Sequence, residues 1–177
     1  MEIAKIENKI LDNEMYIVDF KPFSDLQKFF NIEFTFKINI DKLNKNQNIH
    51  NILSLSKNML ITDINRQLTQ NETIGNGFEI VLINDNNIYS LYIRYLSGRK
   101  EKLFNLPVSD INNTFKFTLY ISKTNDGRYS VKINQITKYM KVNSISDNNI
   151  IIGGKEGFYG QEINKTPLEI IKFLLQT

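Results

Sequence analysis

The sequence offers few side chains that could form a catalytic centre. It contains no cysteine and a single histidine, His50. A serine triad needs a histidine base held by a carboxylate, and a thiolate or histidine-rich metal site needs several such ligands. His50 stands beside Asn48 and Asn51. We therefore expect it to be a surface loop residue, with neither a catalytic nor a metal-binding role.

The carboxylates do not form a hydrolase pattern either. A glycoside hydrolase needs two carboxyl groups that flank the scissile bond, about 5–10 Å apart in a cleft. Glu79 stands alone on an apolar stretch, and Lys100-Glu101-Lys102 is typical of a solvated turn. Gly153-Gly154-Lys155 lacks the spacing of a phosphate-binding loop. The sequence thus predicts a protein that is not an enzyme, and a hydrolase is the remote alternative.

Oxygen ligands for calcium occur in three loops. The stretches 84–87, 125–126 and 147–149 are rich in asparagine and aspartate. Turns favour these residues for conformational reasons, and no spacing here matches a defined calcium loop. We expect no cofactor, and a calcium site stays an open alternative.

Polar and aromatic residues on outward strand faces are the best candidates for a binding surface. Tyrosine combines a ring that can stack with a hydroxyl that can form hydrogen bonds, which suits a sugar or a protein surface. If their strands are neighbours in one sheet, five residues would gather on one face: Tyr92, Arg94, Tyr120, Thr118 and Lys37. The alternative is a solvated sheet face with scattered tyrosines, or a face covered by an oligomer partner.

The elements that position these residues are short strands. Alternation of apolar and polar residues over 32–40 and 115–121 predicts half-buried strands. Apolar runs at 78–83 and 150–152 predict strands covered on both faces. Asp126-Gly127 supplies a hairpin turn, and Gly153-Gly154 a close approach between backbones. The stretch Lys57–Asn76 is ambiguous between a strand with a loop and an irregular helix.

About ten short strands separated by turn residues favour an all-β, two-sheet antiparallel sandwich of one domain, residues 1–177. Residues 1–14 form a polar lead-in to a first strand at 15–20. Residues 166–176 form a short C-terminal helix, with Thr166 as its cap and Pro167 at its first position. The apolar residues Leu168, Ile171, Leu174 and Leu175 support that helix because they recur at helical spacing.

The net charge of +3 is mild and the lysines are dispersed, so we expect no nucleic-acid partner. No apolar run is long enough to insert into a membrane. Residues 1–13 carry charges without an apolar core, unlike a secretory signal, and the location of the protein is left unknown.

The order of these segments resembles the concanavalin A-like superfamily, in particular its laminin G-like and pentraxin-like jelly rolls. The matching pieces are Phe34–Ile38, Gly77–Leu82, Asn125–Gly127, Ile150–Gly154 and Phe158–Gly160. The sequence departs from the family in having no tryptophan before the Asp-Gly turn. The last strand, which the family has after its F-x-G segment, is short or missing here. The E-x-D-x-E triplet of the family's glycanases is also absent.

The resemblance implies a jelly-roll sandwich but only a loose function, because this fold carries lectins, adhesion modules, glycanases and virion proteins. Our first hypothesis is a non-catalytic, lectin-like module that binds a glycan or a surface protein. The alternative is a structural virion protein, such as a capsid-decorating, head-fibre or tail-associated subunit of a bacteriophage, with virion neighbours or a homo-oligomer as partners. The sequence does not decide between them.

Overall fold

The computed structural model of the 177-residue chain describes eleven segments: residues 1–20, 29–55, 78–86, 88–95, 99–106, 114–123, 125, 129–133, 136–140, 149–156 and 162–177. For some strand residues, Arg94 among them, it describes the backbone alone. The ambiguous stretch Lys57–Asn76, the Asp126-Gly127 turn and Phe158–Gly160 lie outside the described residues. Within the described part, no helix has the length and apolar character needed to cross a membrane.

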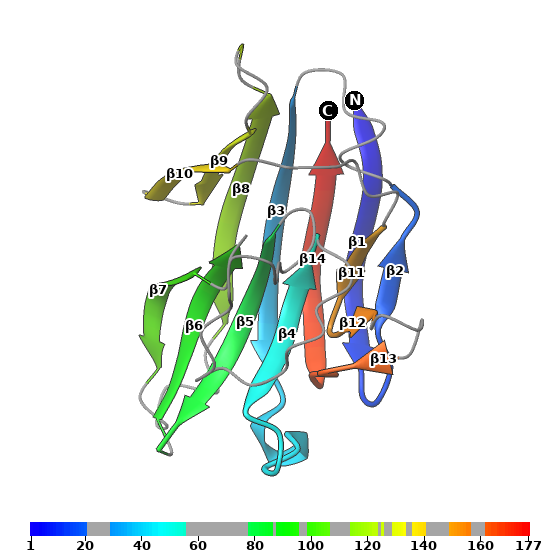
Figure 1. Ribbon diagram of the computed structural model, residues 1–177. Helices are drawn as coiled ribbons and strands as arrows, with labels where there is room; N and C mark the ends of the chain where they lie inside the picture. Colours follow the sequence, from blue (N-terminus) through cyan, green and yellow to red (C-terminus); the bar gives the residue numbers. More distant parts are fainter. Residues whose placement is uncertain are drawn as a thin grey trace.

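Two antiparallel six-stranded sheets make up the fold (Figure 1). Sheet A has the strand order β1 (Glu2–Leu11), β14 (Leu168–Gln176), β3 (Phe29–Ile38), β8 (Phe115–Lys123), β9 (Tyr129–Ile133) and β10 (Ile136–Met140). Sheet B has the order β2 (Tyr16–Val18), β11 (Ile150–Ile152), β4 (Ile49–Ser54), β5 (Phe78–Asp85), β6 (Ile88–Tyr95) and β7 (Arg99–Leu106). Strands β12 (Lys155–Glu156) and β13 (Glu162–Ile163) form a small separate sheet, and a 3-10 turn, η1 (Ile40–Lys42), follows β3.

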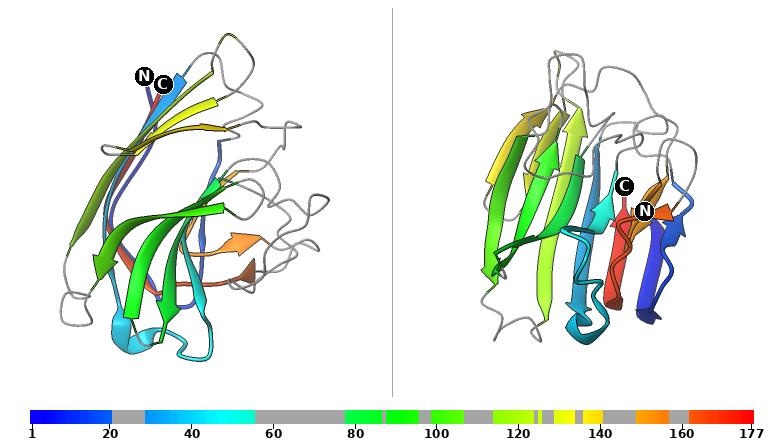
Figure 2. Two further views of the ribbon diagram at one scale, coloured as in Figure 1. Left: turned by 60° about the vertical axis from the view of Figure 1, so that its left-hand side comes forward. Right: turned by 60° about the horizontal axis from the view of Figure 1, so that its bottom comes forward.

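The two sheets face each other as two layers and enclose the main apolar core (Figure 2). The predicted alternation is confirmed in β3, where every second residue from Phe30 to Ile38 is buried, and in β8, where Phe117, Leu119 and Ile121 are buried. Four phenylalanines interlock at the centre of sheet A: Phe34 stacks on Phe36 at 4.8 Å and meets Phe117 and Phe173 edge-on. The predicted all-β sandwich is therefore confirmed.

The predicted C-terminal helix is wrong, because residues 168–176 form strand β14 between β1 and β3. The buried residues are Leu168, Ile170, Phe173 and Leu175. A register shift against β3 between Ile170 and Lys172 inserts an extra residue, so the burial spacing is two, then three, then two. Such a bulged strand imitates the spacing of a helix. Strand β14 is also the final strand that the sequence comparison had found short or missing.

The predicted lead-in at residues 1–14 is also wrong, because residues 2–11 form strand β1, which pairs with β14 along its length. Lys5 and Glu7 are exposed, while Ile6 and Leu11 are buried in the core. The two chain ends lie side by side (Figure 1): the Met1 amine donates to the Thr177 carbonyl at 2.7 Å, and the Thr177 N–H donates to the Met1 carbonyl at 2.9 Å.

Candidate functional site

The five predicted site residues belong to strands of both sheets, and the four whose side chains are described lie on the two opposite outer faces of the sandwich. Tyr92 and Arg94 belong to β6 of sheet B, while Thr118 and Tyr120 belong to β8 and Lys37 to β3, both in sheet A. The condition that they share one sheet is therefore not met. Tyr92 is half-buried, Thr118, Tyr120 and Lys37 are exposed, and the side chain of Arg94 lies outside the described part.

Sheet A carries an exposed aromatic pair, Phe29 and Tyr120, which we call the aromatic platform. The two rings stack with centroids 5.7 Å apart, and they are 44% and 41% exposed. Strand pairing explains the contact, because Asn31 lies opposite Tyr120 and the neighbouring Phe29 is thus diagonal to it on the same face. Thr118 follows on the same strand face. The platform offers apolar ring faces next to hydroxyl and amide groups.

A hollow of about 310 Å³, which we call the Lys37 pocket, lies toward the other end of the same outer face. It is lined by Ile10, Lys37, Ile38, Asn39, Ile40, Asp41, Leu168 and Glu169. Lys37 is six residues along β3 from Asn31, which places it roughly 20 Å from the platform at about 3.3 Å per residue. The structure thus brings together Tyr120 and Thr118, and it separates Lys37 from them.

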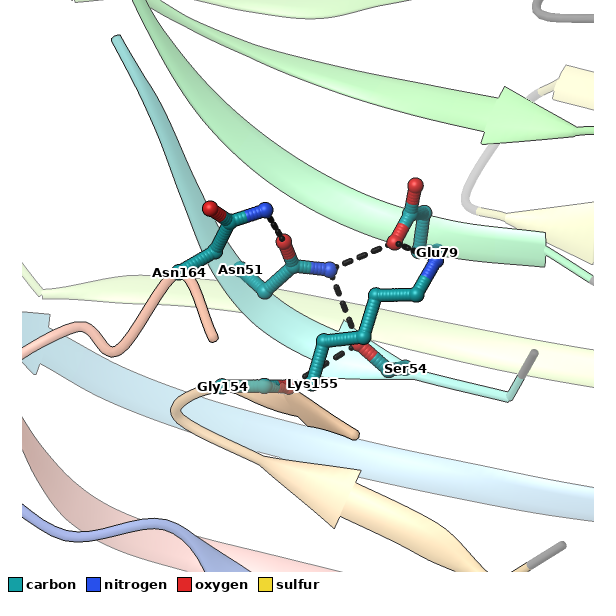
Figure 3. Close-up of polar contacts among 6 residues, drawn as sticks. All are labelled: Asn51, Ser54, Glu79, Gly154, Lys155 and Asn164. Carbon is teal, nitrogen blue, oxygen red and sulfur yellow. Dashed lines mark hydrogen bonds and ion pairs between the residues drawn. The ribbon is translucent and has the colours of Figure 1, made fainter. Parts of the chain in front are cut away.

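Sheet B carries on its outer side a polar group that sequence reasoning missed, the Glu79 cluster of Asn51, Ser54, Glu79, Lys155 and Asn164 (Figure 3). The Asn51 side-chain amide donates to Glu79 Oε2 at 2.6 Å and to Ser54 Oγ at 2.9 Å. Lys155 Nζ forms an ion pair with the same Glu79 oxygen at 3.3 Å. Asn164 donates its amide to Asn51 Oδ1 at 3.1 Å.

Two backbone irregularities assemble this cluster. A register shift between Asn51 and Leu53 in β4 places Asn51 opposite Val81 and Ser54 opposite Glu79, so residues three apart share one face. Asn164 has a left-handed φ of 52°, a conformation that asparagine tolerates. The Thr166 hydroxyl donates to the Asn51 carbonyl at 2.8 Å. Asn164 and Thr166 together attach the connection between β11 and β14 to strand β4 of sheet B.

The charges of the Glu79 cluster are inaccessible, because the side chains of Glu79 and Lys155 are both 0% exposed. A buried carboxylate needs a compensating charge and hydrogen bonds, and Lys155 and Asn51 supply them. Glu79 therefore cannot contact a substrate at the surface. A glutamate inside an apolar strand indicates that a buried partner must neutralise it. The sequence does not show which residue this is, because Lys155 lies 76 positions away from Glu79.

His50 is not a surface loop residue, so that prediction is also wrong. It lies in β4 opposite Leu82, on the core side of sheet B, and its side chain is 0% exposed. Its Nδ1 lies 3.1 Å from the Gln47 amide nitrogen, a donor, which makes Nδ1 the acceptor. Burial lowers the pKa of His50 from 6.5 to about 4, so the ring is neutral at pH 7.

Among the residues that the structure describes, no group of three or more histidines and carboxylates is arranged as a metal site. The three asparagine-rich loops considered for calcium fall partly outside that set. The calcium alternative accordingly remains a prediction.

No family model matches the chain, and no curated protein matches its sequence. Solved structures do share its fold. The CBM40 domain of Ruminococcus gnavus IT-sialidase is similar over 99% of this chain and 92% of that one, with a TM-score of 0.50 and 13% identity. The same domain bound to α2,6 sialyllactose gives a TM-score of 0.51 with 13% identity, over 99% of this chain and 92% of that one.

The K499G mutant of NanB sialidase from Streptococcus pneumoniae is similar over 99% of this chain and 26% of the longer enzyme, with a TM-score of 0.51 and 15% identity. At these identities the likeness establishes the β-sandwich fold alone.

Proposed function

We propose that this protein is a non-catalytic glycan-binding module with a concanavalin A-like sandwich fold. The observation that carries the proposal is the likeness, over 99% of the chain, to a CBM40 domain that was solved with α2,6 sialyllactose bound. The proposal treats residues 1–177 as one domain. A sialylated oligosaccharide is therefore the first ligand to test.

The described carboxylates support a binding role over hydrolysis. Glu79 is buried and paired with Lys155, so it is not available to a substrate. Asp41 and Glu169 line the Lys37 pocket, but Asp41 is exposed to solvent. A general acid for glycoside cleavage needs an environment that raises its pKa, typically an apolar enclosure. The remote hydrolase alternative predicts release of sialic acid or reducing sugar, which Asp41→Asn and Glu169→Gln would abolish.

The binding surface is on one of the two outer faces, and single substitutions distinguish them. Tyr92→Ala removes a ring from sheet B, and Tyr120→Ala removes one from sheet A. Each variant is the control for the other, because both remove a tyrosine from a non-edge strand of a six-stranded sheet. Loss of affinity in one variant alone assigns the face.

We would titrate the protein with α2,6 sialyllactose and with lactose by isothermal calorimetry, after screening a broad glycan array. Saturable binding to at least one glycan, weakened at least tenfold by Tyr92→Ala or by Tyr120→Ala, is the expected result. Absence of binding across the array and to host surfaces would refute the proposal. Circular dichroism of both variants checks that the sandwich still folds.

The alternative of a structural virion subunit predicts self-assembly or attachment to neighbouring subunits, and light scattering tests it directly. A trimer or larger closed assembly at physiological salt would favour that alternative. A monomer in dilute solution would favour the soluble binding module.

A further inference from the structure

We propose that the Lys37 pocket is a second binding site, which takes a single sugar-sized polyol that carries one ammonium group. Amino sugars of the hexosamine type are the corresponding ligand class. The site lies roughly 20 Å along β3 from the aromatic platform, at about 3.3 Å per residue, and on the opposite side of the sandwich from Tyr92. It is therefore separate from both surfaces considered for the larger glycan.

The pocket is built on a row of side chains across three adjacent strands of sheet A. Ile10 of β1 lies opposite Glu169 of β14, and Glu169 lies opposite Lys37 of β3. Directly opposed residues on one sheet face have Cβ atoms about 5 Å apart. The row therefore presents an apolar group, a carboxylate and an ammonium group side by side, on rigid strands.

The 3-10 turn η1 forms the wall of the pocket and contributes Asp41. Two contacts fix this wall. The Asn39 N–H donates to the Pro167 carbonyl at 3.0 Å, and Lys42 Nζ forms an ion pair with Asp12 at 2.7 Å. The wall is thus tied to the start of β14 and to the residue that follows β1. A ligand would meet a preformed site, which lowers the entropy cost of binding.

The charged groups of the pocket are available to a ligand. Within the described part of the chain, the side chains of Lys37, Asp41 and Glu169 have no hydrogen-bond or ion-pair partner. Lysines nearby differ: Lys42 is paired with Asp12, and Lys172 is paired with Glu33 on the same sheet face. Glu169 lies opposite Lys37 across the strands without forming an ion pair with it, so both charges can interact with a ligand in the pocket.

The charge balance and the volume define the ligand. Two carboxylates and one ammonium group give the pocket a net negative charge, which favours a cation and disfavours a polyanion. Lys37 can donate hydrogen bonds to hydroxyls, and Ile10, 62% exposed, can pack against the apolar face of a ring. A volume of about 310 Å³ lies at the lower end of the range for small-molecule pockets, which fits one ring.

The test is a titration of the full chain, followed by two-dimensional ¹⁵N–¹H NMR, with glucosamine, glucose and methylammonium chloride at neutral pH. We expect saturable shifts of the amides at residues 37–41 and 168–169 with glucosamine. We expect binding at least fivefold weaker with glucose, which lacks the charge, and with methylammonium, which lacks the ring.

Two substitutions and a matched control complete the test. Glu169→Gln and Asp41→Asn keep the shape of the side chains and remove one negative charge each, and each is expected to weaken glucosamine binding at least fivefold. Lys132→Gln alters an exposed residue on β9 of the same sheet and should leave glucosamine binding unchanged. Equal affinity for glucose and glucosamine, or unchanged binding in Glu169→Gln, would overturn the proposal.

The same variants keep this proposal distinct from the glycan-binding function. Sialyllactose binding by the unmodified protein tests that function without reference to the pocket. If Glu169→Gln weakens sialyllactose binding and glucosamine does not bind, the pocket belongs to the larger glycan site and the second site does not exist.

Discussion

The outer faces of the two sheets contain ion pairs of the same length in different environments. On sheet B, Lys155 and Glu79 lie 3.3 Å apart with both side chains 0% exposed. On sheet A, Lys172 and Glu33 lie 3.3 Å apart with side chains 41% and 36% exposed. Water competes for the second pair and cannot reach the first. The comparison indicates that the pair on sheet B is enclosed in the fold, while the pair on sheet A is open to water.

Removing one member of the buried pair should have the largest effect on stability. Lys155→Met removes one member of a fully buried ion pair, and such a loss costs about 3–5 kcal/mol. Lys172→Met in the exposed pair should cost less than about 1 kcal/mol. Urea denaturation of the two variants measures both values under identical conditions.

A double variant, Glu79→Leu with Lys155→Met, sharpens this comparison. It removes both charges, so it should be more stable than Lys155→Met alone, because replacing a buried pair by apolar residues is often neutral. Similar losses in Lys155→Met and Lys172→Met would contradict the distinction between the two faces.

Acidification should destabilise the protein through His50. Its pKa is about 4 in the folded chain, against an ordinary value of 6.5, because burial disfavours the charged ring. Folding thus favours the neutral form. The contribution of neutral His50 to the free energy of unfolding is complete above pH 6.5. It is lost as the pH falls from 6.5 to 4, which lowers the free energy of unfolding by up to about 3 kcal/mol.

Free energies of unfolding from urea curves at pH 7, 5.5 and 4 measure this dependence. His50→Gln removes the titrating group, so its stability should vary less between pH 6.5 and pH 4 than that of the unmodified protein. An identical pH profile in the two proteins would show that other groups cause the acid sensitivity.

Two adjacent glycines offer a smaller, matched test of the connection that covers sheet B. Gly153 has a φ of +76°, and a Cβ there would lie 3.0 Å from Leu11 Cδ1 and 3.3 Å from the Thr166 carbonyl oxygen. Gly153→Ala should therefore cost about 1–3 kcal/mol, from backbone strain at positive φ. Gly154→Ala should cost less, since its nearest neighbour is the flexible side chain of Met15 at 3.1 Å. Thermal denaturation ranks the two variants, and the reverse order would contradict this account.

The sequence predicted the sandwich well because period-two burial is a local property that each strand shows by itself. It failed at β14, where the bulge between Ile170 and Lys172 changes the phase of the alternation. It also failed at His50, because neighbouring asparagines suggested a loop where the chain forms β4. Local patterns identify a strand and its two faces, but a bulge or a polar context can disguise them.

The candidate site was less predictable, because alternation says that a residue faces outward without saying from which sheet. Tyr92 and Tyr120 have similar local patterns, yet the strand order places them on opposite sides of the sandwich. The pairing of Glu79 with Lys155 and the row from Ile10 to Lys37 likewise depend on contacts between distant segments. Such contacts follow from strand order and register, which no single strand encodes.

The smallest stability effect is expected at the aromatic platform. Tyr120→Ala removes the stack with Phe29, and both rings are more than two-fifths exposed, so the loss should be about 0.5–1 kcal/mol. Phe117→Ala removes a ring on the core side of the same strand and should lower the free energy of unfolding by about 3–5 kcal/mol. Urea denaturation compares the two. A loss above about 2 kcal/mol in Tyr120→Ala would mean that the platform is part of the packed structure, and it would weaken the case that sheet A keeps its outer face free for a ligand.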